Sequence, residues 1–342
     1  MAINLNLDTE QETAELIPTL HNLGHPLASD ADLDPLLDQI GDANYVLLGE
    51  ASHGTANYYT WRARLTKRLI IEKDFSFIAV EGDWPDCYEV NRYIKQYANA
   101  SADAQSVLHN FARWPTWMWA NWEIVALAEW LRQYNGASDQ LGAAQVGFYG
   151  LDVYSLWESM TSILDYLAEN LPDAMETARR AYLCFEPYNE DAQSYAWHTS
   201  IVPETCEDEV VDLLAAVRRN VQTYPGDPEA NFNVEQNALV AVDGERYYRT
   251  MVRGGPDSWN VRDHHMVDTL DRLMDHHRQL HPDGNAKAIV WEHNTHIGDA
   301  RATDMVRAGM VNVGQLVRAR HDAEGVLLVG CGSYRGSVIA GE

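Results

Sequence analysis

Five short apolar runs, each closed by a glycine or by polar residues that include an acid, constrain the fold of this chain most strongly. They are YVLLGE at 45–50, FSFIAVEG at 75–82, VGFYGLDV at 146–153, AKAIVWEHN at 286–294 and GVLLVGCG at 325–332. None alternates between apolar and polar residues, which indicates strands covered on both faces. A helical pattern at 55–73 joins the first two runs into a β–α–β unit. The sequence therefore predicts an α/β fold with a three-layer core and a mainly parallel sheet.

The segment between the third and fourth runs has a different pattern. From 155 to 281, apolar residues recur at intervals of three and four, as in SLWESMTSILDYLAENL and WNVRDHHMVDTLDRLMDHHRQL, and no convincing strand occurs. This periodicity indicates a large helical insertion. We therefore predict an α/β core made of residues 1–154 and 285–342, with the insertion at 155–284.

Composition limits the classes of partner. The formal net charge of −26 is spread along the 342 residues, and such a charge repels nucleic acid. The four cysteines form no C-x-x-C pair, so neither a disulfide framework nor a thiolate zinc site is indicated. The N-terminus has no signal-peptide pattern, and no apolar run approaches the roughly 20 residues of a membrane span. We expect a cytoplasmic protein without nucleic-acid or membrane partners, and we leave its oligomeric state open.

Ionisable residues follow four of the five runs. Glu50 and His53 follow the first, Glu81 and Asp83 the second, Asp152 the third, and Glu292, His293 and His296 the fourth. Ligands of open parallel sheets bind at the carboxyl ends of the strands, where these residues would share one rim. A single polar residue at a strand end is common, but recurrence at four ends predicts a functional site.

Six separated motifs occur in order along the chain. They are LLGEASHGTANYYTWRARLTKRLI, AVEGDWPDCYEVNRYI, RWPTWMWAN, GFYGLDVYSLWESM, WNVRDHHM, and VWEHNTHIGDARATDM followed by NVGQLVR. Together they resemble the erythromycin esterase family, which includes homologues of succinoglycan biosynthesis proteins. The resemblance runs from about residue 20 to the end. It implies an α/β core with a helical insertion and a hydrolase that opens a macrolide lactone by activating water. Family members continue beyond GSVIAGE, so we expect this chain to lack a C-terminal portion.

The resemblance also implies site residues. The family's catalytic histidine falls on His53, its partner glutamate on Glu50, its helix arginine on Arg62, its second glutamate on Glu81, and its two late histidines on His293 and His296. Imidazole suits a base near neutral pH, and a glutamate such as Glu50 or Glu81 can fix its tautomer. Arg62 would hold the substrate carbonyl or the oxyanion. The late histidines would polarise that carbonyl or protonate the leaving alcohol.

Alternatives use the same residues. Ser52 in EASHG resembles a nucleophile elbow, but Glu50 replaces the first glycine of G-x-S-x-G. The histidines and a carboxylate could hold a metal that activates water, although Arg62 disfavours a dication. The rim could also bind without catalysis, as in an accessory protein of polysaccharide metabolism. We expect no metal and no cofactor, and a small amphipathic ester or lactone as substrate. The tryptophans of RWPTWMWANW could line a pocket, but packing in the core is more typical of their spacing.

Overall fold

The structure is a computed structural model that describes residues 17–18, 22–137, 142–188, 191–202, 204–219, 227–281 and 284–337. The chain divides into two units, Met1–Gly41 and Asp42–Glu342. In the first unit, the 3₁₀ helix η1 (Asp30–Leu33) leads directly into the short helix α2 (Asp34–Ile40). The site described below lies in the second unit.

The second unit contains a five-stranded sheet in which all strands run parallel. The strands are β1 Tyr45–Leu48, β2 Phe77–Asp83, β3 Gly147–Asp152, β4 Ala288–Trp291 and β5 Val326–Val329. Each coincides with one of the five apolar runs, so the predicted α/β class and parallel sheet are confirmed. The order is β3-β2-β4-β1-β5. The expected β–α–β connection joins β1 to β2 in parallel through α3, and β4, from a distant part of the sequence, lies between these two strands and pairs with both.

Helices connect these strands. They are α3 Ala56–Lys73, α4 Trp84–Ile94, α5 Ala104–Leu108, α6 Trp122–Ala137, α7 Leu156–Asn170, α8 Met175–Phe185, α9 Ala192–Ile201, α10 Glu207–Arg219, α11 Ala230–Met251, α12 Asp257–Leu280, α13 Asn294–Ile297 and α14 Val313–His321. Shorter 3₁₀ segments are η2 Thr116–Met118, η3 Gly142–Ala144, η4 Pro172–Ala174, η5 Glu186–Tyr188, η6 Ala300–Ala302, η7 Asp304–Ala308 and η8 Asp322–Glu324. Helices α7 to α12 lie between β3 and β4, which confirms the predicted helical insertion. The boundaries proposed for it stay a prediction.

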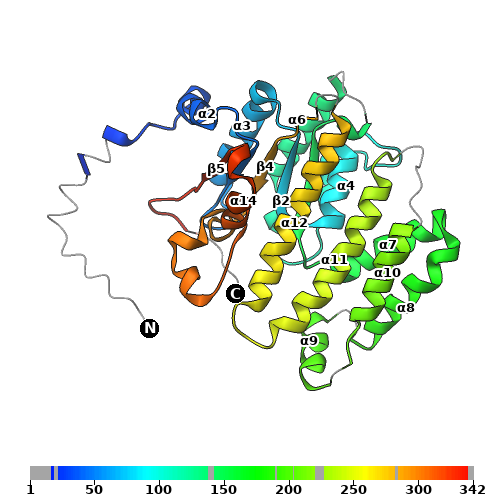
Figure 1. The fold of residues 1–342 in the computed structure, drawn as a ribbon. Coiled ribbons are helices and arrows are strands. Elements are labelled where there is room, and N and C mark those ends of the chain that lie inside the picture. The colour runs from blue at the N-terminus through cyan, green and yellow to red at the C-terminus, as the bar shows by residue number, and fades with distance from the viewer. Residues whose placement is uncertain are drawn as a thin grey trace. The chain divides into compact units, whose positions relative to one another are not determined.

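The sheet is packed between helices. On one face, alternate strand residues such as Tyr45 and Phe77 form a buried cluster with Met266 and neighbouring residues of α12. On the other face, Trp291 Nε1 of β4 donates to Thr66 Oγ1 of α3 at 3.0 Å. Burial of apolar side chains on both faces is the main force that holds such layers together. Figure 1 shows α12 crossing the sheet, with α11 between α12 and the group of α7, α8, α9 and α10. The three-layer core is thus confirmed.

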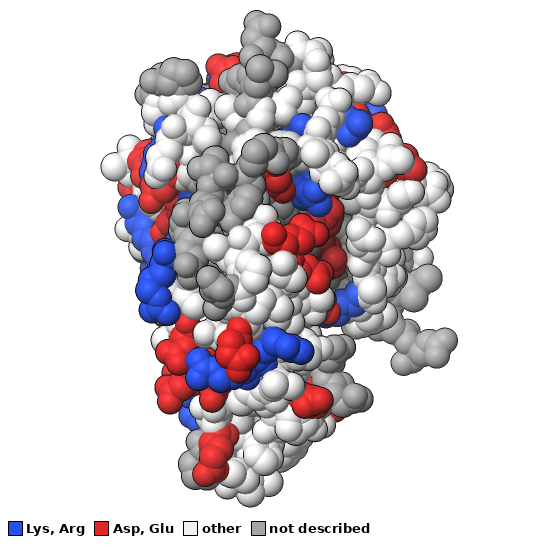
Figure 2. All heavy atoms as spheres, turned by 90° about the vertical axis from the view of Figure 1, so that its right-hand side faces the viewer, with Lys and Arg blue, Asp and Glu red and all other residues white. Residues whose placement is uncertain are grey.

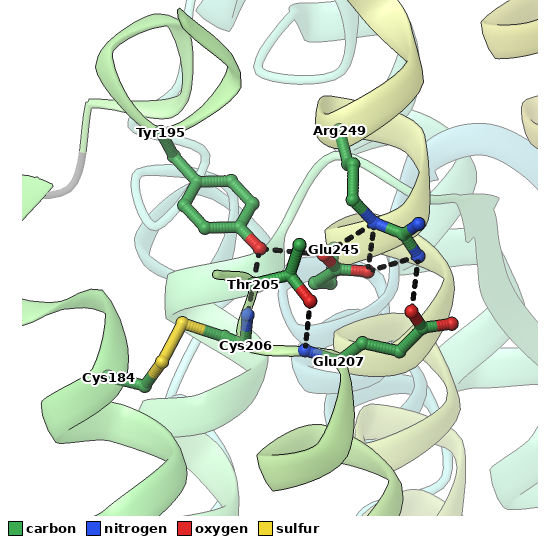
Figure 3. The surroundings of a disulfide bond; sticks show 7 residues. All are labelled: Cys184, Tyr195, Thr205, Cys206, Glu207, Glu245 and Arg249. Atoms are coloured by element: carbon green, nitrogen blue, oxygen red, sulfur yellow. Dashed lines mark hydrogen bonds and ion pairs between the residues drawn. A yellow bond between two sulfur atoms is a disulfide. The ribbon is translucent and has the colours of Figure 1, made fainter. Parts of the chain in front are cut away.

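The insertion carries a disulfide that the sequence analysis did not anticipate. Cys184 of α8 is bonded to Cys206, which directly precedes α10, with a Cα–Cα distance of 5.9 Å (Figure 3). Tyr195 supports this point, because its hydroxyl accepts from Cys206 N–H and donates to Glu245 Oε1 at 2.6 Å. The expectation that no disulfide forms is wrong, because the pairing depends on the packing of α8 against α10 and not on a local motif. Disulfides are typical of oxidising compartments, so the cysteine-based argument for a cytoplasmic location no longer holds.

Charged residues are intermixed on the surface. On the face shown in Figure 2, acidic side chains form several groups with Lys or Arg beside them, and they do not merge into one acidic patch. This distribution is that of a solvated surface. In the described part of the chain, no helix is both long enough and apolar enough to cross a membrane.

Candidate active site

A cavity of about 410 Å³ lies at the carboxyl ends of the strands. Its polar lining includes His53, which follows β1, Glu81 of β2, Asp152 at the end of β3, and Arg262 of α12. Because parallel strands all end at this edge of the sheet, residues from distant parts of the sequence meet here. Aromatic side chains, among them Trp117, complete the wall.

His53 is held by a buried carboxylate. Glu50 Oε1 lies 2.8 Å from His53 Nδ1, and Glu50 itself is 0% exposed. A carboxylate oxygen can only accept, so Nδ1 carries the proton and Nε2 is left as the basic nitrogen. Nε2 lies 3.9 Å from Glu81 Oε1, and the His53 side chain is 31% exposed. The arrangement therefore presents an imidazole base to the cavity.

The surroundings of His53 favour its protonated form. Burial by itself lowers the pKa of His53, but the hydrogen bond to Glu50 and the negative charges of Glu81 and Glu50 outweigh this effect. The result is a pKa raised above its usual 6.5. A base with a raised pKa accepts a proton more readily, and it is fully neutral only at higher pH.

Arg62 lies behind Glu50 and does not line the cavity. Its Nη2 donates to Glu50 Oε2 at 2.7 Å, and the residue is only 2% exposed. The guanidinium stacks between the rings of Tyr59, at 4.7 Å, and Trp291, at 4.6 Å. Its Nε and Nη1 have no hydrogen-bond partner among the described residues. From this position Arg62 does not reach into the cavity to contact a substrate carbonyl, as was expected. Its hydrogen bond instead orients the Glu50 carboxylate.

Arg262 is the central cation of the site. Its Nη2 donates to Glu81 Oε1 and to Asp152 Oδ2, both at 2.7 Å, and its Nε donates to Asp152 Oδ1 at 2.9 Å. Burial alone would raise the pKa of Asp152, but Arg262 lowers it to about 2. Burial also opposes ionisation of Glu81, but His296, Arg262 and His53 lower its pKa. Both carboxylates are therefore ionised.

Sequence analysis did not select Arg262, although it lies within WNVRDHHM. The need for a positive charge beside several carboxylates could have pointed to Arg262. Several carboxylates were expected at one rim, and buried carboxylates need a cation and hydrogen bonds to stay ionised. Arg262 is a cationic side chain within one of the quoted motifs, and a search for cations to balance these carboxylates would have included it.

The two late histidines occupy different positions. His293 lies beside His53, with ring centroids 5.2 Å apart. Its Nδ1 accepts from Thr295 N–H at 3.2 Å, so a neutral His293 carries its proton on Nε2. Its own backbone N–H donates to Glu81 Oε2 at 2.8 Å. His296 is 2% exposed and does not line the cavity.

His296 belongs to the support of the site. Its Nδ1 lies 3.0 Å from Asp263 Oδ1, its Nε2 lies 3.0 Å from Arg262 Nη1, and its ring stacks on Trp259. It therefore holds Arg262 and is too buried to protonate a leaving alcohol directly. The neighbouring Glu292 is 1% exposed, and neither carboxyl oxygen has a hydrogen-bond partner among the described residues. Burial raises the pKa of Glu292 well above its usual range.

The predicted residues thus form one connected group. The chain of contacts runs through Arg62, Glu50, His53, Glu81, His293 and His296. Of these six, His53 and Glu81 are among the residues that line the cavity. Their convergence agrees with the strand-end argument, whereas their catalytic roles stay predictions. Ser52 also lines the cavity, and its Oγ lies 2.7 Å from Thr55 Oγ1.

The tryptophan-rich segment forms part of the cavity wall. Trp119 is buried, and its Nε1 donates to the Glu81 carbonyl at 2.9 Å. Trp117 packs on Gly54, whose φ is +75° and where a Cβ would lie 2.5 Å from the Trp117 ring. Trp114 lines the cavity but is 70% exposed, and Trp122 is 69% exposed. Packing in the core is therefore wrong for these two, because Trp114 borders the cavity and Trp122, the first residue of α6, lies on the surface.

The nitrogen atoms of the site have partners that compete with a metal. Nδ1 of His53 is bound by Glu50, Nδ1 of His293 accepts from Thr295, and His296 contacts Arg262 and Asp263. A dication at this rim would also meet the positive charge of Arg262. Within the described residues, no group of three or more His, Cys, Asp or Glu side chains is arranged to hold a metal ion.

Comparison with protein families identifies a match over most of the chain. The erythromycin esterase family model matches residues 70–342. The matched range contains Glu81 and both late histidines, and it begins after His53. Among curated proteins, the chain is similar to erythromycin esterase type II of Escherichia coli, with 27% identity over 131 residues. That similarity covers 38% of this chain and 28% of the relative, less than a third of the relative's length.

Solved structures share the fold. A succinoglycan biosynthesis protein aligns with a TM-score of 0.70 and 21% identity, covering 93% of this chain and 74% of that chain. A protein from Bacillus cereus aligns with a TM-score of 0.67 and 23% identity, covering 91% and 73%. A mutant of the erythromycin esterase EreC in its open conformation aligns with a TM-score of 0.58 and 16% identity, covering 88% and 73%. At these identities the likeness concerns the arrangement of helices and strands.

Proposed function

Because the chain belongs to the erythromycin esterase family, we propose that it is a hydrolase that cleaves an ester or a lactone with water activated by His53. The observation that carries this proposal is the pair of imidazoles at the strand ends. His53 offers an unprotonated Nε2, whereas His293, 5.2 Å away between ring centroids, offers an Nε2–H. One ring can accept a proton from water while the other donates a hydrogen bond to the carbonyl oxygen.

The proposed reaction needs no covalent intermediate. His53 Nε2 takes a proton from water as the water oxygen bonds to the carbonyl carbon. The carbonyl electrons move to oxygen, and the resulting anion accepts a hydrogen bond from the Nε2–H group of the His293 ring. When the tetrahedral species collapses, the bond to the leaving oxygen breaks and His53 returns its proton to that oxygen. Such a base contributes typically about 10²- to 10⁴-fold to the rate.

The remaining residues position this pair. Glu50 fixes the His53 tautomer and stabilises the imidazolium, and Arg62 orients Glu50 from behind. Glu81 joins the two halves of the site, because its Oε1 lies 3.9 Å from His53 Nε2 and its Oε2 accepts from the backbone N–H of His293. Aromatic walls over a charged floor suit an amphipathic ester or lactone, in line with the family.

Turnover of an ester panel tests the proposal. Wild-type protein should hydrolyse at least one reactive aryl ester or lactone, with and without a chelator. Ser52→Ala should retain this activity, because the nucleophile is water. Loss of activity in a folded Ser52→Ala protein would point to an acyl-enzyme, and loss with chelator followed by recovery on adding metal would point to a metal-bound water. Failure to hydrolyse any ester, with measurable ligand binding, would favour an accessory protein.

A further inference from the structure

Both arginines that line the cavity are already paired. Arg113 forms two hydrogen bonds with Asp83, Nε to Oδ2 and Nη2 to Oδ1, each at 2.6 Å. Arg262 is paired with Glu81 and Asp152. A ligand anion would therefore have to displace a buried carboxylate, which costs a charge-assisted hydrogen bond. Among the described residues that line the cavity, no Arg or Lys is free for an anionic substrate.

One carboxyl group that lines the cavity, that of Asp86, has no cationic partner among the described residues. Asp86 lies in the first turn of α4, half-buried, and lines the same cavity as His53. Among the described residues it has no hydrogen bond or ion pair. Burial and the negative charges of Asp83, Glu158 and Glu89 raise the pKa of Asp86 to about 7, although the positive charge of Arg113 opposes them. The ionised form of Asp86 is thus poorly stabilised in the free protein, and a ligand cation beside the carboxylate would stabilise it.

Asp86 also lines a second cavity, of about 330 Å³. The described lining of this second cavity contains three carboxyl groups, from Asp86, Glu89 and Glu158, and no Lys, Arg or His. The lining also supplies neutral hydrogen-bonding groups such as Asn110 and Ser162. The two cavities therefore meet at Asp86. Glu89 is balanced by Arg92, whose Nη1 lies 3.0 Å from Glu89 Oε1, so Asp86 is a lining carboxylate left for a ligand cation.

We propose that Asp86 binds a protonated amine of the ligand at the junction of the two cavities, so that the site selects cationic amphipathic molecules. The apolar part of the ligand would lie against exposed aromatic surface such as Trp114 and Trp117, which also attracts cations through its π-faces. This inference deepens the proposed function and rests on it only in taking the bound molecule as the substrate. Binding itself can be measured without turnover.

A matched pair of probes tests the inference. Phenylbutylamine and phenylbutanol have the same apolar body and differ in charge, and calorimetry gives the affinity of each at pH 8. There the amine is protonated and Asp86 is ionised. A hydrogen bond to a charged group is worth about 10- to 100-fold in affinity, so the wild type should prefer the amine by at least about tenfold. Asp86→Asn should abolish most of this preference, whereas Asp86→Glu should keep part of it.

The control is Asp165→Asn. Asp165 is an exposed residue of α7 outside both cavities, and its replacement changes the net charge equally. It should keep the preference of the wild type. A second measurement needs no variant: at pH 7 the amine should release protons from Asp86, seen as a buffer-dependent binding enthalpy, and the alcohol should not.

Equal affinity of the wild type for both probes, or an unchanged preference in folded Asp86→Asn, would overturn the inference. So would amine binding without proton release at any pH from 5.5 to 8. Results that contradict the role of Asp86 can be distinguished from results that contradict the hydrolase activity. A protein that hydrolyses esters but shows no preference for the amine contradicts only the role of Asp86. A protein that binds the amine through Asp86 but hydrolyses no ester contradicts only the hydrolase.

Discussion

The His53 and His293 rings lie side by side and carry their protons on different nitrogen atoms when neutral. Their ring centroids lie 5.2 Å apart, and the Nδ1 atom of each ring is engaged on the side of the protein, by Glu50 in one case and by Thr295 in the other. The Glu50 carboxylate leaves His53 Nε2 as an acceptor, whereas the Thr295 N–H leaves a proton on His293 Nε2.

Replacing Glu50 with Gln should shift the pH profile. The raised pKa of His53 places the acid limb of kcat/KM in the wild type above 6.5, because the base must lose its proton to act. Gln removes the charge that favours the imidazolium, so the limb should move to lower pH by about one unit, and the maximal rate should fall. Profiles from pH 5 to 9 check this. Glu72→Gln, on the exposed part of α3, is the control with an unchanged profile. An acid limb that does not move in Glu50→Gln would show that the limb does not report His53.

Replacing Arg62 with Lys should lower kcat more than it raises KM. Lysine cannot stack as a plane between Tyr59 and Trp291, and so holds Glu50 less well. We expect kcat to fall about 10-fold with a nearly constant KM, because Arg62 does not line the cavity. Arg68→Lys on the same helix serves as the control. A higher KM with unchanged kcat would instead support the direct substrate contact expected from the sequence.

The disulfide should stabilise the insertion without taking part in catalysis. Cys184 and Cys206 are separated by 22 residues, and a cross-link of that span contributes about 3 kcal/mol to the free energy of unfolding. The double substitution of both cysteines by Ser should lower Tm and leave turnover at 25 °C unchanged, because neither residue lines the cavity. Reductant should lower Tm of the wild type but not of the double variant. A wild-type Tm that stays constant after full reduction would contradict this role.

The sequence was sufficient for the elements of the fold but not for their order. Strands buried on both faces leave continuous apolar runs such as YVLLGE, which are visible locally. The place of β4 between β1 and β2 depends on pairing over a long sequence distance, and no local pattern encodes it. The disulfide escaped prediction for the same reason, since α8 and α10 bring Cys184 to Cys206.

The sequence was sufficient to bring together those residues of the candidate site that lie at the ends of strands. Glu50, Glu81 and His293 sit at or directly after strands, so topology alone brings them to one edge. Arg262 and Asp86 were not selected because no local pattern marks them, and the charges that surround them come together only in the folded chain. The burial of Arg62 and His296 could not be predicted either. Sequence spacing does not distinguish a side chain that lines a cavity from one that lies behind the lining.

The most direct test of the account is the turnover of His53→Ala measured beside ligand affinity. For one ester hydrolysed by the wild type, kcat should fall about 10²- to 10⁴-fold, because the base acts mainly on the transition state. The Kd of a non-hydrolysable analogue should change less than about threefold, because the binding walls are unaltered. A folded His53→Ala protein with the kcat of the wild type would contradict the claim that His53 activates the water.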